Sequence, residues 1–100
     1  MEQTERIMEM ERRMESAAKA VMELSAAIDN YEEAQEAIAA LDAYYGSKEW
    51  KQDFADDEAG RLPADLKRGV LSEDGIWNLL SDVSELNLRI RFFLRNSMFV

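Results

Sequence analysis

The sequence predicts an all-α protein with a long N-terminal helix, a short aromatic middle helix and a C-terminal helix. Two observations support this fold class. Apolar residues recur every three or four positions in the first and last parts of the 100-residue chain. The first forty-five residues contain no glycine or proline and are rich in alanine, glutamate and methionine, which favour helices. We expect one domain over residues 1–100, arranged as a coiled-coil-like helical hairpin or bundle.

The N-terminal helix is predicted from Gln3 to about Tyr44. Its apolar positions follow a heptad pattern and then drift as a straighter helix would. Gly46 suits the position just after a helix, where the backbone becomes left-handed. The apolar positions are Ile7, Met10, Met14, Ala17, Val21, Leu24, Ile28 and Tyr31, followed by Ala34, Ile38, Leu41 and Tyr45.

A break in this helix is the alternative. Asp29 with Glu32, and Asn30 with Glu33, match the capping-box pattern and could start a new helix near Tyr31. The apolar pattern nevertheless passes through this region without losing phase. We therefore predict one continuous helix.

The middle of the chain predicts a short helix from residue 48 to about 58, capped by Ser47 and ended by Gly60. Tyr45, Trp50 and Phe54 would then meet on one side. Residues 62–67 suit a single helical turn with Pro63 at its first position, and residues 67–69 a turn.

The C-terminal helix is predicted over residues 73–96. Ser72 is the expected N-cap, and Leu71 with Ile76 forms a hydrophobic staple across it. Gly75 is the unexpected residue, because a larger side chain would favour the first turn of a helix.

The helix lengths predict self-association. A 42-residue helix is about 63 Å long and a 24-residue helix about 36 Å, so a hairpin would leave roughly 27 Å of the first helix uncovered. A bare apolar face is unfavourable in water. We expect a homodimer, formed by antiparallel pairing of the long helices or by two hairpins in a four-helix bundle. A parallel in-register pair would align the acidic residues, so the overall charge favours an antiparallel pair or pairing with a different protein. A break near Asp29 and Asn30 would instead fold the N-terminal half back in a monomer.

The composition excludes several functions. The chain has no cysteine and no histidine, which removes disulfides, thiol nucleophiles, Ser-His-Asp triads and the usual zinc ligands. The net charge of −9 disfavours nucleic-acid binding. No apolar run approaches the length of a transmembrane helix, and the N-terminus does not resemble a signal peptide. We expect a cytoplasmic protein without a cofactor.

Two carboxylate pairs suggest an enzymatic alternative. Glu33 with Glu36, and Asp53 with Asp56, resemble the paired acids with which all-α nucleotide pyrophosphohydrolases hold Mg²⁺. With 21 acidic residues, chance alone places about four acid pairs at this helical spacing. The chain has five. The pattern therefore favours solvated helix faces, and no catalytic or metal-binding residue is assigned outside this alternative.

Aromatic and charged residues cluster around the middle segment. They could plug the end of the hairpin as a small core, which we favour, or form a groove for an acidic or aromatic ligand. The C-terminal residues Arg89, Arg91, Arg95, Met98, Phe99 and Val100 are basic and apolar, and we expect them to pack rather than to touch a membrane. The candidate binding or structural face consists of Tyr45, Trp50, Asp53, Phe54, Asp65, Lys67, Arg68 and Trp77.

The middle segment resembles a family of short bacterial proteins, the domain of unknown function 4298. The resemblance implies an all-helical bacterial protein and transfers no catalytic residue. It depends on Tyr44-Tyr45-Gly46-Ser47, Glu49-Trp50, Asp53-Phe54, Asp57-Glu58-Ala59-Gly60 and the run from Leu62-Pro63-Ala64-Asp65 to Leu71-Ser72-Glu73-Asp74, with weaker likeness in the flanking helices. The sequence thus favours a non-enzymatic interaction or adaptor module that self-associates, with a Mg²⁺-dependent nucleotide phosphohydrolase as the alternative.

Overall fold

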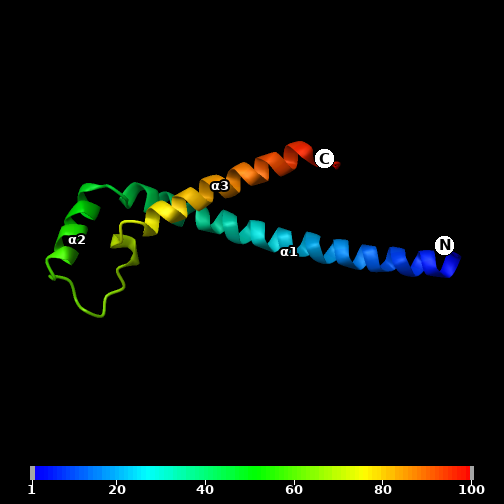
Figure 1. Cartoon of the computed structure of the whole chain (residues 1–100), viewed down its shortest axis with the longest axis horizontal. Coiled ribbons are helices and arrows are strands. Elements are labelled where there is room, and N and C mark those ends of the chain that lie inside the picture. Colours follow the sequence, from blue (N-terminus) through cyan, green and yellow to red (C-terminus); the bar gives the residue numbers. More distant parts are fainter. Residues whose placement is uncertain (1, 100) are drawn as a thin grey trace. The chain divides into compact units, whose positions relative to one another are not determined.

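The computed structural model describes residues 2–99 and is built from helices (Figure 1). The elements are α1 (Gln3–Tyr44), α2 (Lys48–Glu58), the 3₁₀ helix η1 (Gly69–Leu71) and α3 (Gly75–Asn96). No strand occurs within residues 2–99. The all-α class is therefore confirmed, with its long first helix, short aromatic second helix and C-terminal helix.

The contacts divide the chain into two compact units. Unit 1 is Met1–Glu36, and unit 2 is Ala37–Val100. As far as it is described, unit 1 is one stretch of α1, whereas unit 2 contains the end of α1 together with α2, η1 and α3. The single domain expected over residues 1–100 stays a prediction.

Helix α1 is continuous through Asp29 and Asn30, so the alternative with a break there is wrong. Its first turn is capped by the Glu2 carboxylate, which accepts a hydrogen bond from the Glu5 N–H at 2.7 Å. Along its surface, Arg12 and Arg13 both bind Glu9 and lower the pKa of that carboxyl. The helix ends where Gly46 has a φ of 79°, a left-handed conformation that suits glycine.

Helix α2 begins as the sequence predicts. The Ser47 hydroxyl accepts a hydrogen bond from the Trp50 N–H at 3.1 Å and donates one to the Tyr44 carbonyl at 2.6 Å. One side chain therefore ends α1 and caps α2. At the other end Gly60, with a φ of 72°, takes the chain out of the helix.

The segment between α2 and α3 differs from the prediction. Instead of a helical turn over residues 62–67, it has one turn in which the Leu66 N–H donates to the Pro63 carbonyl at 3.2 Å. The turn expected at residues 67–69 is absent: residues 67 and 68 form no turn, and Gly69 begins the 3₁₀ helix η1, which was not predicted. The Ser72 hydroxyl donates to the Gly69 carbonyl at 2.8 Å, and this bond closes the short 3₁₀ helix.

Helix α3 begins at Gly75, two residues later than predicted. The N-cap residue is Asp74, whose side chain makes no capping hydrogen bond, so the expectation that Ser72 is the N-cap is wrong. The Ser72 hydroxyl nevertheless accepts a hydrogen bond from the first N–H of the helix, that of Gly75, at 3.0 Å. Leu71 and Ile76, the expected staple, are the two buried apolar side chains of the described chain. They form the centre of unit 2.

Gly75 fits its position because of the close approach of η1, so the expectation that a larger residue would suit this turn is wrong. A Cβ atom at Gly75 would lie 2.4 Å from the Gly69 carbonyl oxygen and 2.7 Å from the Ser72 Oγ. These atoms close η1 and bind the first N–H of α3, so neither can move away without breaking a hydrogen bond.

We expect Gly75→Ala to lower the free energy of unfolding by about 2 kcal/mol, because the new methyl group overpacks the η1 junction. Gly69→Ala is the matched control, since a Cβ there meets no atom within 4 Å. It should be neutral or slightly stabilising through the unfolded state. Urea unfolding of both variants measures the difference, and equal stabilities would contradict this account of the junction.

Candidate functional site

Three aromatic side chains pack together in unit 2 and form what we call the aromatic brace, Tyr45, Trp50 and Phe54. The rings of Tyr45 and Trp50 meet edge to face with centroids 5.1 Å apart. Those of Trp50 and Phe54 stack with centroids 5.3 Å apart. Ring pairs of this kind stabilise by about 0.5–1.5 kcal/mol beyond the area that they bury. The structure thus brings together the three rings that the sequence placed on one side.

The aromatic brace also ties α2 to the residues around η1. The Trp50 Nε1–H donates to the Val70 carbonyl at 2.9 Å, and the Tyr45 hydroxyl donates to the Glu73 carbonyl at 3.4 Å. Both bonds join residues at least twenty positions apart. Sequence reasoning did not find Val70, because a backbone acceptor leaves no signal in residue type. The bonds use the polar atoms of the brace within unit 2, which favours the interpretation of the brace as a small core.

Asp53 is held by Tyr44. The Tyr44 hydroxyl donates to the Asp53 carboxylate at 2.6 Å in a half-buried setting. This hydrogen bond, together with burial and the negative charge of Asp53, raises the pKa of Tyr44 to about 12 from the ordinary value of 10.0. Asp53 is therefore engaged by the end of α1.

The raised pKa of Tyr44 predicts a specific loss of stability at alkaline pH. The folded chain holds this proton more tightly than the unfolded chain, so the contribution is complete below pH 10 and disappears as the pH rises toward 12. Tyr44→Phe should abolish this part of the pH dependence. Unfolding experiments on both proteins between pH 9 and 12 would reveal it, and identical profiles would refute it.

Two ion pairs fix the chain around the end of α2. Arg68 binds Asp57 at 2.8 Å, and Arg61 binds Asp56 at 3.0 Å. All four side chains are partly exposed, so each pair contributes at most about 1 kcal/mol. Arg68, a member of the candidate face, thus ties the irregular segment to α2.

The remaining candidates do not join the brace. Trp77 is 58% exposed, and Asp65 and Lys67 also lie at the surface. Lys67 borders a shallow groove of unit 2 whose other lining residues are Leu41, Gly69, Val70, Gly75, Ile76 and Leu79. The candidate face is therefore divided between a structural brace and separate surface positions.

The four carboxylates of the enzymatic alternative are divided between the two units. Within the described residues there is no group of three or more acidic side chains that could hold a metal ion. Asp53 accepts from Tyr44, and Asp56 accepts from Gln52 and Arg61. Glu33 and Glu36 belong to unit 1, whereas Asp53 and Asp56 belong to unit 2.

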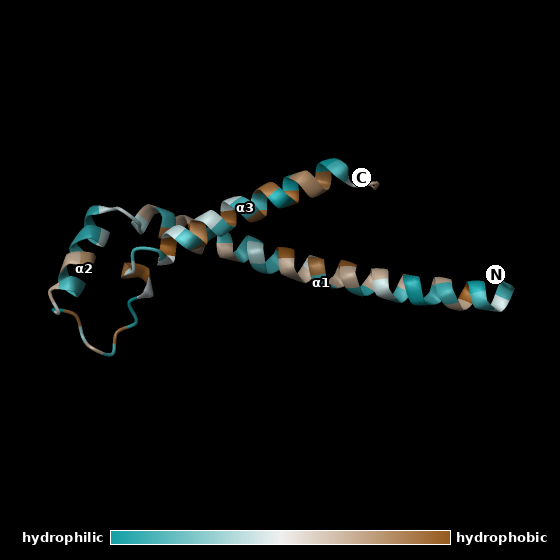
Figure 2. Cartoon of the chain, in the orientation of Figure 1, coloured by the Kyte–Doolittle hydropathy of each residue, from teal (hydrophilic) through white to brown (hydrophobic). Residues whose placement is uncertain are grey.

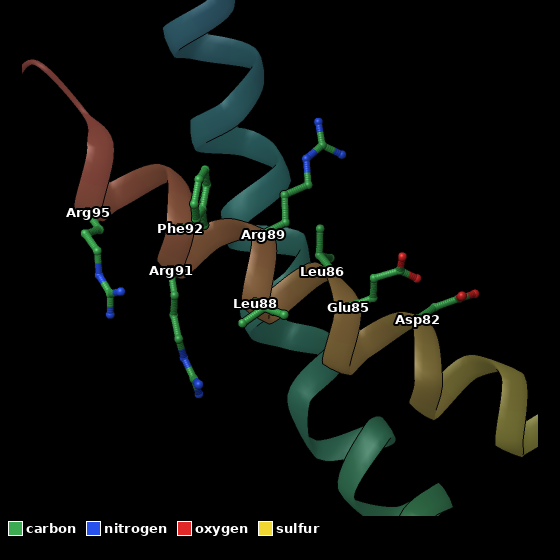
Figure 3. Close-up of a pocket in the computed structure, with 8 residues that line it drawn as sticks. All are labelled: Asp82, Glu85, Leu86, Leu88, Arg89, Arg91, Phe92 and Arg95. Atoms are coloured by element: carbon green, nitrogen blue, oxygen red, sulfur yellow. The ribbon is translucent and has the colours of Figure 1, made fainter.

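Helix α3 has an open depression between Asp82 and Arg95, lined by both charged and apolar side chains (Figure 3). Figure 3 shows that every labelled side chain comes from this one helix, with Arg91 and Arg95 extended on one side and Phe92 on the other. A single helix cannot enclose a ligand. The three arginines near its C-terminal end suit the helix dipole. The packing expected for the tail stays a prediction for Met98 and Phe99, and Val100 lies outside the described residues.

Helix α1 exposes a row of apolar side chains in unit 1. We use the name apolar stripe for the heptad positions from Ile7 to Ile28, which lie in unit 1. Figure 2 shows hydrophobic residues interleaved with hydrophilic ones along α1. Apart from Ala17, which is also exposed, the exposed fractions are 53% for Ile7, 53% for Met10, 61% for Met14, 68% for Val21, 58% for Leu24 and 48% for Ile28.

The described helices are not hydrophobic enough over a sufficient length to span a membrane. None of the helices in the described part of the chain combines the length and the hydropathy that crossing a bilayer would require. The apolar stripe is instead one face of a helix whose other positions over residues 7–28 are occupied by charged and small residues and by Met8 and Met22, and heptad stripes of this kind are typical of helix–helix interfaces.

Comparison with known proteins identifies the family. Neither the curated proteins nor the solved structures contain a match to this chain. A protein-family model does match, and it spans residues 7–92, from the first residue of the apolar stripe to the last turns of α3. The chain therefore belongs to the family described as Domain of unknown function (DUF4298).

Proposed function

We propose that the chain is a non-enzymatic helical interaction module that self-associates through the apolar stripe of α1. The observation that supports this proposal most strongly is the exposure of six large apolar side chains at heptad positions, each close to half exposed or more. Soluble proteins rarely leave so large a continuous apolar surface uncovered unless it is an interaction site.

A long helix with no partner would also be only marginally stable in water. Helices derive most of their stability from packing of an apolar face rather than from residue propensity. Unit 1 contains no buried side chain within its described residues, so the described part of unit 1 does not itself supply that packing for the stripe. Pairing with a second helix would supply it.

The proposed module would act by presenting unit 2 on a paired helix, as a small adaptor does. Its polar contacts support this assignment, because the brace and the ion pairs of α2 use their polar groups within the chain. The proposal includes a cytoplasmic location. Disulfides are rare in that reducing compartment, and a chain without cysteine does not need them. No observation favours the phosphohydrolase alternative.

Sedimentation equilibrium tests the proposal on the unmodified chain. A chain of 11.5 kDa should sediment at about twice that mass at micromolar concentration and dissociate on dilution. A mass of one chain at every concentration up to the millimolar range would overturn the proposed self-association.

A further inference from the structure

The charged residues beside the apolar stripe are sorted by sign. With Ile7 as position a of the heptad, the stripe alternates between a and d positions up to Ile28. The charged residues at the flanking g positions are both basic, Arg6 and Arg13. Those at the flanking e positions are both acidic, Glu11 and Glu32. The other flanking residues within α1 up to Ala34 are small: Thr4, Ala18, Ala20, Ser25, Ala27 and Ala34.

From this arrangement we propose that the stripe binds a second copy of α1 in parallel and in register, an inference that rests on the self-association proposed above. In a parallel pair each g position faces the e position of the following heptad on the other helix. Arg6 then faces the partner's Glu11, and symmetry repeats the pair on the opposite side. Both residues are exposed and available for it.

An antiparallel pair offers no such match. It brings g against g and e against e in every register, so the basic flank never meets the acidic one. Arg6 and Arg13 would face each other or alanines, and Glu11 and Glu32 would face each other or small residues. The overall charge of the helix favours antiparallel pairing. The individual e and g positions, however, favour parallel pairing, because only in a parallel pair do basic and acidic residues face each other.

The residues of the stripe favour the same geometry. Three of its four a positions are β-branched, namely Ile7, Val21 and Ile28, and Leu24 occupies a d position. β-Branched residues at a together with leucine at d favour parallel two-stranded coiled coils. The methionines at positions 10 and 14 are flexible enough to fill the remaining layers.

The acidic second half of α1 does not oppose this arrangement. Glu23, Asp29, Glu33 and Glu36 occupy b, c and f positions, which point away from the partner helix. Only Glu32 flanks the stripe there, and it faces an alanine, the partner's Ala27. Repulsion between the outward-facing carboxylates is weakened by salt over about 8–10 Å.

Single cysteines test the direction and the register, because the chain has none of its own. Met10→Cys and Leu24→Cys, each made in the full chain and equilibrated in a glutathione redox buffer, should both form disulfide-linked dimers. A parallel in-register pair is the one arrangement that brings both positions against their own copies. Ala26→Cys, at an f position, is the matched control and should stay uncrosslinked.

The outcomes separate this inference from the proposed function. If the chain has a dimeric mass by sedimentation but either Met10→Cys or Leu24→Cys fails to form a disulfide, the parallel in-register arrangement is overturned. The proposed self-association is then still supported. If a disulfide forms only when Met10→Cys is mixed with Ile28→Cys or Val21→Cys, the helices pair antiparallel. This result would also overturn the parallel register. A monomeric mass would overturn both.

The charge pattern supplies a second test that does not depend on crosslinking. Arg6→Glu should raise the dissociation constant of the dimer about 10-fold at low salt. The new glutamate would face the partner's Glu11, and symmetry repeats this repulsive pair on the other side of the dimer. Adding Glu11→Arg should restore most of the affinity. Lys19→Glu changes the charge equally at an f position and should have little effect. Equal effects of Arg6→Glu and Lys19→Glu would contradict the proposed pairing.

Discussion

Trp50→Ala is expected to lower the free energy of unfolding of unit 2 by about 3 kcal/mol. The substitution removes the central ring of the aromatic brace, and with it both ring contacts. It also removes the hydrogen bond from Nε1 to the Val70 carbonyl. Unit 2 has two buried apolar side chains, Leu71 and Ile76, among its described residues, so few other contacts can compensate. Near-ultraviolet circular dichroism during urea unfolding measures the loss.

Trp77→Ala is the matched control for this prediction. The same residue type is deleted, but Trp77 is 58% exposed and takes no part in the brace. Surface substitutions of this kind change stability by about 0.5 kcal/mol or less. If both variants lost the same stability, the brace would not be the element that holds unit 2 together.

Leu24→Glu is expected to raise the dissociation constant of the proposed dimer at least ~100-fold. Leu24 lies in the middle of the apolar stripe, and each dimer would bury two unpaired carboxylates in place of two leucines. Burying a charge without a partner is among the most costly changes at an interface. Light scattering across a dilution series gives the dissociation constant.

Ala26→Glu adds the same charge two residues away, on the outer face of α1. It should leave the dissociation constant within a few-fold of that of the unmodified chain, since screened surface charges interact weakly. Equal weakening by both substitutions would indicate a general effect of acidity. The apolar stripe would then not be the interface.

The helices could be predicted from the sequence because local signals determine them. The heptad pattern and the absence of glycine and proline outweighed the two capping boxes near Asp29, and α1 continues through them. Ser47 and Gly46 define the junction between α1 and α2 through local hydrogen bonds and a positive φ. The spacing of Tyr45, Trp50 and Phe54 was sufficient to place the three rings together.

The contacts around η1 could not be predicted in the same way. From the sequence, Gly75 was expected to be unfavourable in a helix. The reason for glycine is the Gly69 carbonyl oxygen, which leaves no space for a side chain at position 75. The 3₁₀ turn that brings this oxygen close has no sequence signature. The candidate face was divided for a related reason. Residue type alone does not distinguish Trp50, which binds the Val70 carbonyl, from the exposed Trp77.

Hydrogen exchange of the α1 amides over residues 7–31 tests most directly whether the apolar stripe is covered by a second helix. We expect slow exchange at concentrations where the chain is dimeric, because pairing stabilises the helix, and rapid exchange after dilution or in Leu24→Glu. Rapid exchange at every concentration would contradict the account, and so would protection that persists unchanged in a monomer.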